Sequence, residues 1–166
     1  LTVHFTDTEA VRWGTCGENV TWALDSSGVL TISGTGRMTD YSSEETPSYA
    51  ENNITSVIIN NGITHIGSNA FYNLSALMSV TIPESVVSIG SSAFSGCTGL
   101  SNLSLSDGLS EIGDSAFAGC TALTDVAVPG SVRTIGNSSF SGCTELSSLS
   151  LSDGLSEIGD SAFAGC

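Results

Sequence analysis

Hydrophobic positions recur every 23 residues along most of this chain. The segment LSLSDGLSEIGDSAFAGC at 103–120 returns unchanged at 149–166, and a diverged copy, VAVPGSVRTIGNSSFSGC, lies between them at 126–143. One column of the repeat is always phenylalanine: Phe71, Phe94, Phe117, Phe140 and Phe163. Repeats of this length bury an apolar face only by stacking on their neighbours. The periodicity therefore predicts a solenoid.

Each repeat contains signals for three local structures. Val80-x-Ile82 alternates apolar and polar residues, which predicts a short strand that pairs in parallel with its copies at a spacing of ~4.8 Å. Ile89-Gly90 ends a second short extended piece. The next column holds only residues that favour a helix N-cap: Ser68, Ser91, Asp114, Asn137 and Asp160. The residues that tolerate a left-handed C-cap follow a few positions later: Asn73, Gly96, Gly119, Gly142 and Gly165. We therefore expect an α/β solenoid in which each repeat carries short strands and a one-turn helix.

The first part of the chain does not follow the period. Residues 20–24 and 30–32 alternate around Asp25-Ser-Ser-Gly28, which predicts a β-hairpin. A solenoid needs a terminal element over its first core layer, and Trp13, Trp22 and Met38 are suitable covers. We divide the chain into a β-rich cap at 1–53 and an array of about five repeats at 54–166, the last one truncated.

The array has no corresponding cap at its other end. The last repeat would leave its apolar underside uncovered at Leu149, Leu151, Leu155, Ile158 and Phe163. We expect further repeats or another chain to cover this end, and the natural protein to continue past Cys166.

Charge excludes several functions. The 166 residues contain 17 Asp and Glu against three basic residues, all arginine, for a net charge of −14. Without a basic patch, binding to nucleic acid or to an anionic membrane surface is excluded, and the absence of lysine rules out lysine chemistry. No apolar run is long enough to cross a membrane. This composition suits an acidic soluble protein outside a cell.

The residues that most often carry chemistry have simpler explanations here. Four cysteines lie 23 residues apart, at 97, 120, 143 and 166, so they stack in register. We expect them to be free thiols in the core, in preference to a disulfide or a metal site. Cys16 lies outside this column and should pack under the hairpin. His65 shares a variable column that indicates an exposed position. The acidic columns offer calcium ligands, but N-capping and a solvated face explain them better. The sequence predicts no catalytic residue and no cofactor.

The outward positions of the first strand in each repeat form the expected binding surface, because solenoids present such sheets to partners. Within the array they are Ser79, Thr81, Asn102, Ser104, Asp125, Ala127, Ser148 and Ser150. None is an aromatic residue or an arginine, the types that supply most binding energy at interfaces. Tyr41, Tyr49 and Tyr72, near the cap and first repeat, are therefore added as candidates for a contact patch.

The unit L-x-x-V-x-I-P-x-x-V-x-x-I-G-x-x-A-F-x-x-C at 77–97 resembles the BspA-type leucine-rich repeat. The segment from Cys16 through Met38 also resembles the N-terminal module that precedes such repeats in many bacterial surface proteins. The resemblance implies a right-handed leucine-rich-repeat coil in a secreted or surface-attached protein of host-associated bacteria. It implies adhesion or binding to a host or matrix protein, without family-wide catalytic residues. The alternatives are a passive spacer or stalk, and a non-catalytic domain attached to an enzyme.

Overall fold

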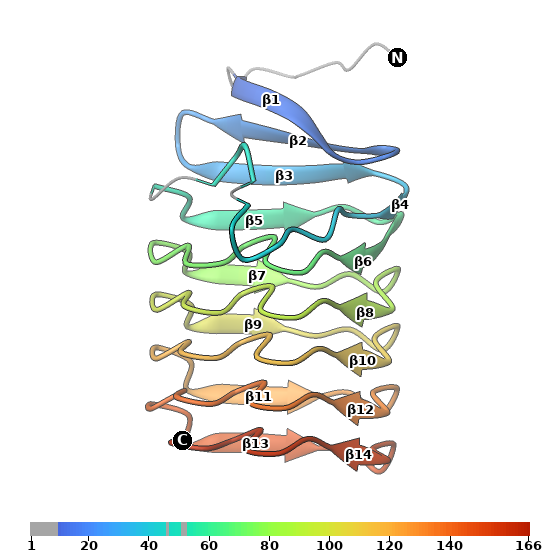
Figure 1. Ribbon diagram of the computed structural model, residues 1–166, viewed down its shortest axis with the longest axis vertical. Coiled ribbons are helices and arrows are strands. Elements are labelled where there is room, and N and C mark those ends of the chain that lie inside the picture. The colour runs from blue at the N-terminus through green and yellow to red at the C-terminus, as the bar shows by residue number, and fades with distance from the viewer. Residues whose placement is uncertain (1–9, 46, 51–52) are drawn as a thin grey trace.

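The structure is a computed structural model that describes residues 10–45, 47–50 and 53–166, with side chains from residue 12 onward. Its strands stack along one long axis, with the hairpin at one end and the last repeat at the other (Figure 1). The predicted solenoid is confirmed. The hairpin is confirmed as well, because Trp22 on one strand lies opposite Ile32 on the antiparallel neighbour.

The strands form two walls. The first wall holds a six-stranded sheet with the order β1-β2-β3-β5-β7-β9, followed by the two-stranded sheet β11-β13. These strands are β1 (Ala10–Gly17), β2 (Val20–Asp25), β3 (Val29–Gly34), β5 (Ser56–Ile59), β7 (Ser79–Thr81), β9 (Asn102–Ser104), β11 (Asp125–Val128) and β13 (Ser148–Leu151).

The second wall is one six-stranded sheet with the order β14-β12-β10-β8-β6-β4. Its strands are β4 (Gly36–Arg37), β6 (Ile63–Ile66), β8 (Ser88–Ile89), β10 (Glu111–Ile112), β12 (Thr134–Ile135) and β14 (Glu157–Ile158). The pairs that join consecutive repeats are parallel and in register at a step of 23 residues, as Ser79 opposite Asn102 shows. The hairpin belongs to the same stack, because β3 pairs in parallel with β5.

The expectation of one-turn helices is wrong: the described residues contain strands and turns but no helix. The backbone explains why, because one residue in each repeat takes a left-handed conformation with φ near 55°, as at Ser92 and Ser115. A right-handed helix cannot continue through such a residue. The column expected at helix C-caps is also left-handed, from Asn73 to Gly165, and there it closes a turn.

The predicted N-cap column has a different role. Asp114 Oδ1 accepts a hydrogen bond of 2.6 Å from the Asn137 N–H, and Asn137 Oδ1 accepts one of 2.7 Å from the Asp160 N–H. These side chains therefore connect one coil to the next, where the sequence had placed them at the start of a helix.

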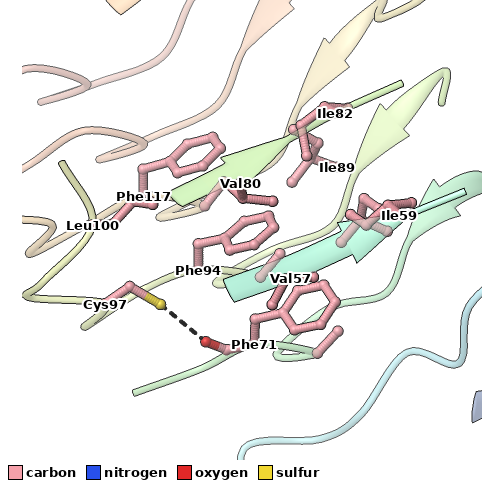
Figure 2. Packing of buried hydrophobic residues seen from close by; sticks show 14 of the residues in the cluster. Val57, Ile59, Phe71, Val80, Ile82, Ile89, Phe94, Cys97, Leu100 and Phe117 are labelled. Atoms are coloured by element: carbon pink, nitrogen blue, oxygen red, sulfur yellow. Dashed lines mark hydrogen bonds between the residues drawn. The ribbon is translucent and has the colours of Figure 1, made fainter. Parts of the chain in front are cut away.

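The core between the walls is a continuous stack of aromatic rings (Figure 2). From Phe71 to Phe163, neighbouring ring centroids lie 5.0 to 5.4 Å apart. Trp22 and Met38 cover the first layer as expected, but Trp13 does not, because it points away from the core and is 73 % exposed.

The cysteines form a second row along this core. All five thiols are free, as predicted, and those of Cys97, Cys120 and Cys143 are buried. The Cys97 thiol donates to the Phe71 carbonyl oxygen at 3.1 Å (Figure 2), and its copies repeat this contact. Cys16 is buried within β1, whereas Cys166 is exposed, contrary to expectation, because it lies in the last layer of the stack.

Candidate functional site

The predicted contact residues of the array lie on the outward face of the first wall. In β11, outward Asp125 and Ala127 alternate with Val126 and Val128, which are buried. The same alternation places Ser79 and Thr81 on β7, and the equivalent residues of β9 and β13, on this face. We call it the outer face: it comprises Ser79, Thr81, Asn102, Ser104, Asp125, Ala127, Ser148 and Ser150.

Five of these residues line one shallow cavity of about 230 Å³. They are Ser79, Thr81, Asn102, Ser104 and Asp125, and the remaining lining comes from Val80, Ser101 and Leu103. The cavity lies beside the position where the first wall changes from its six-stranded to its two-stranded sheet. The array therefore gathers hydroxyl, amide and carboxylate groups at one place on its outer face.

The expectation that Tyr49 contributes to a contact patch is wrong. Tyr49 is fully buried, its hydroxyl donates to the Ala70 carbonyl oxygen at 3.0 Å, and its ring lies 5.5 Å from Trp22 and 5.9 Å from Phe71. It extends the phenylalanine stack by one layer, and burial raises its pKa well above the usual value for a tyrosine. Tyr72 is 48 % exposed and Tyr41 is partly buried, and neither belongs to a strand of the first wall.

Sequence reasoning missed two exposed apolar residues on the first wall. Trp13 on β1 pairs with Ala23 on β2, and the same cross-strand row continues through Thr31 to Ile58, which is 47 % exposed. The row then reaches Thr81, so it joins the outer face. The sequence did contain a signal that Trp13 is exposed. Positions 13 and 16 differ by an odd number of residues, so they point to opposite sides of a regular strand, and Cys16 points inward.

The electrostatics of the outer face are acidic. Asp125 lies within it, and Asp25 ends β2, where a hydrogen bond from the Ser27 hydroxyl lowers the pKa of the Asp25 carboxyl. The arginines are engaged elsewhere. The Arg12 guanidinium donates to the Ser48 carbonyl oxygen at 2.6 Å, and the Arg133 guanidinium donates to the carbonyl oxygens of Gly130 in its own coil and Gly154 in the next coil. Arg37 lies on the second wall, 3.7 Å from Asp40.

A second hollow of about 310 Å³ lies on the second wall. Its carboxylates come from Glu111, Asp114 and Glu157. One oxygen of Asp114 already accepts the Asn137 N–H. Within residues 10–45, 47–50 and 53–166, no three His, Cys, Asp or Glu side chains meet in a way that could hold a metal ion.

His65 is buried, not exposed as its variable column suggested. Its Nδ1 lies 2.7 Å from the Ser88 hydroxyl, and its Nε2 lies 3.0 Å from Asp40 Oδ1. Serine, histidine and aspartate in this order could activate a nucleophile, provided that free N–H groups nearby stabilise the oxyanion. The N–H groups of Val87 and Gly90, which flank β8, already donate to carbonyl groups of the preceding coil. The described contacts therefore support a structural connection between the β4 segment and the array.

These features define the chain as a leucine-rich-repeat solenoid. The family model of the BspA-type leucine-rich repeat region matches residues 45–166, in six copies. The chain therefore belongs to this family. A search of curated proteins finds no match.

Solved structures of bacterial leucine-rich-repeat proteins are similar to it. A protein from Eubacterium ventriosum is 30 % identical with a TM-score of 0.72, over 89 % of this chain and 44 % of that one. A protein from Bacteroides ovatus is 32 % identical with a TM-score of 0.68, over 83 % of this chain and 34 % of that one. A leucine-rich cell surface protein from Faecalibacterium prausnitzii is 28 % identical with a TM-score of 0.63, over 95 % of this chain and 47 % of that one. The chain thus spans less than half the length of these proteins.

Such repeat domains are typically non-catalytic and bind proteins. The described residues include no long apolar helix of the kind that crosses a membrane.

Proposed function

We propose that this chain is a non-enzymatic adhesion module that acts outside the cell and binds a host or matrix protein through its outer face. The observation that carries the proposal is the gathering of five predicted contact residues around one cavity on that face. The likeness to a bacterial cell surface protein supports the location. In this proposal residues 1–53 cap the stack, and the array at 54–166 presents the face.

The alternative function is a passive spacer that positions another domain. One observation favours it: the outward residues from β7 to β13 are small, and none is aromatic or an arginine. Most interfaces depend on a few large anchors of those types. Trp13 and Ile58, on the same wall, supply exposed apolar groups that the outward positions of β7, β9 and β11 lack.

Binding of the full chain to a panel of purified extracellular-matrix proteins separates the two functions. The test variant is Ser104→Arg on the outer face, and the matched control is Thr134→Arg on β12 of the second wall. We expect Ser104→Arg to weaken binding by roughly tenfold or more, because a buried bulky charge at an interface is costly, and Thr134→Arg to have little effect. Equal affinities in the two variants would assign binding to another surface. Absence of binding to every member of the panel would favour the spacer.

A further inference from the structure

The first wall has an exposed aromatic residue at its cap end. Trp13 on β1 is 73 % exposed, and its neighbour across the strands is Ala23 on β2. Because the alanine side chain is a single methyl group, it leaves the indole ring largely uncovered. Tryptophan is one of the residue types that most often anchor a protein interface. The cap end therefore carries the kind of group that the outward positions of β7, β9 and β11 lack.

A fixed carboxylate lies next to this ring. Asp25 ends β2 on the same side as Ala23, which makes it a diagonal neighbour of Trp13. Such neighbours lie ~7–8 Å apart, within reach of an aromatic side chain. Asp25 Oδ1 accepts hydrogen bonds from the Ser27 N–H at 2.9 Å, the Ser27 hydroxyl at 2.7 Å and the Val29 N–H at 3.0 Å. All three bonds use the same oxygen, so they hold the carboxylate in place while Oδ2 faces a donor from outside.

The basic residues of the chain point elsewhere. Arg12 precedes Trp13 and points to the opposite side of β1, where its guanidinium lies 6.0 Å from the ring centroid of the buried Trp22. Arg37 and Arg133 lie on the second wall, and the chain contains no lysine. An indole face and a carboxylate both attract a cation. The two groups therefore match a cation that another molecule supplies.

The row that begins at Trp13 leads to a second exposed apolar group. Ala23 pairs with Thr31 on β3, and Thr31 pairs with Ile58 on β5, which is 47 % exposed. These strands lie side by side at the cap end of the stack (Figure 1). Three strand steps place Ile58 about 14 Å from Trp13, a span that an extended chain covers in about four residues. We call Trp13, Asp25 and Ile58 together the anchor patch.

We propose that the anchor patch binds a short extended segment of the partner protein. In that segment, an arginine or lysine side chain lies between the Trp13 ring and the Asp25 carboxylate, and an apolar side chain packs on Ile58. Charge argues for a basic segment and against a second copy of this chain, because two molecules of net charge −14 repel each other. This inference rests on the proposed function: it names the chemistry of the partner and extends the contact surface from the array onto the cap.

The first experiment measures the electrostatic field at Trp13 with ionic quenchers of fluorescence. The chain has two tryptophans and Trp22 is buried, so Cs⁺ and I⁻ reach mainly Trp13. Relative to free N-acetyltryptophanamide, we expect stronger quenching by Cs⁺ than by I⁻. Asp25→Asn should reduce this difference, because it keeps an oxygen for the bonds from Ser27 and Val29 but removes the charge.

The matched control for this measurement is Glu157→Gln, which removes the same charge from β14 on the second wall. It should leave the difference between the two quenchers unchanged, since charges that far apart are screened. Equal reductions in both variants would assign the field to the net charge of the whole chain and would overturn the role of Asp25.

The second experiment selects linear peptides of about ten residues from a displayed random library on the whole chain. Selected peptides should be enriched in Arg or Lys, with an apolar residue about four positions away. Each is then compared with a copy in which citrulline replaces arginine, or acetyl-lysine replaces lysine, so that the charge is lost. We expect the neutral copy to bind the parent chain roughly tenfold more weakly, and to bind Asp25→Asn almost as well as the charged peptide does, because the two changes remove the same interaction.

Substitutions of the two apolar residues test the rest of the patch. Trp13→Ala should weaken binding of a selected peptide by roughly tenfold or more, Trp13→Phe by less, and Ile58→Thr by roughly threefold. Thr81 occupies the position of Ile58 in the next strand, so threonine suits this site. The matched control is Val87→Thr, because Val87 is 50 % exposed beside β8 on the second wall.

Three results would overturn the inference: selection of no peptide or of peptides without a basic residue, unchanged binding in Trp13→Ala, and a neutral copy that is weakened equally in the parent chain and in Asp25→Asn. A ligand that needs Trp13 but ignores Asp25 and salt, as a neutral oligosaccharide would, also overturns it. If a matrix protein binds and is sensitive to Ser104→Arg but not to Trp13→Ala, the anchor patch is excluded while the proposed function stands.

Discussion

Asp40 and His65 connect the segment after β4 to the first full coil, with Asp40 Oδ1 lying 3.0 Å from His65 Nε2. The same oxygen accepts the Ser68 N–H at 2.8 Å. Burial by itself would raise the pKa of Asp40, but the hydrogen bonds from Ser68 and His65 outweigh it and lower the pKa from 3.8 to about 2. Folding therefore favours the ionised carboxylate at this position.

The first prediction concerns the pH dependence of stability that follows from this carboxylate. Because the pKa of Asp40 is lower in the folded state, its contribution is fully present above pH 3.8 and is lost as the pH falls through about 2. We expect the free energy of unfolding, measured by urea titration, to fall across this window in the parent chain. Asp40→Asn should reduce that slope. An unchanged slope in the variant would show that Asp40 does not contribute.

A second prediction compares a core residue with an outer-face residue. Phe117 is fully buried between two rings, so Phe117→Ala should lower the free energy of unfolding by roughly 3–5 kcal/mol. Ser104 is exposed on β9, and Ser104→Ala should change it by less than about 0.5 kcal/mol. Denaturant titrations of the two variants give these values directly. Similar losses in both would contradict the assignment of the two columns.

The thiols provide a third prediction. Burial raises the pKa of the Cys97 thiol to about 12 and that of Cys143 to about 11, so both should react slowly with a thiol reagent at mildly alkaline pH in the native chain. Cys166 is exposed and should react first. All five thiols should react once the chain is unfolded. Cys97 reacting as fast as Cys166 would contradict the packing described here.

The part of the fold that repeats could be predicted, and the part that depends on differences between repeats could not. The phenylalanine column requires stacked coils, because only stacking buries five rings in register. The helix was a wrong prediction because the side-chain oxygen of Asp114 accepts an N–H equally well from its own turn or from the next coil. Sequence spacing alone does not distinguish these two donors.

The candidate site shows the same division. Alternation placed Ser79, Thr81 and Ser104 on one face, and the structure agrees. Tyr49 lies in the part of the chain without a period, so no column indicated its place in the ring stack.

The last prediction concerns the open end of the 166-residue chain. Leu149, Leu151 and Ile158 are 39 %, 42 % and 48 % exposed, whereas Val126, one coil earlier, is 3 % exposed. An apolar layer with free strand edges favours pairing with another chain or fraying. In isolation, the chain should therefore self-associate through this end, and amide hydrogen exchange should be fastest in β13 and β14.

Small-angle scattering at increasing protein concentration measures the association. Leu149→Lys with Ile158→Lys should suppress it, because the two ammonium groups would lose their hydration when the end of the stack packs against the apolar layer of a second chain. The matched control is Val87→Lys, since Val87 is 50 % exposed but lies in the middle of the array, where substitution should leave association unchanged. A particle that stays monomeric, with β13 and β14 exchanging as slowly as β7 and β8, would show that the end layer is stable without a cover.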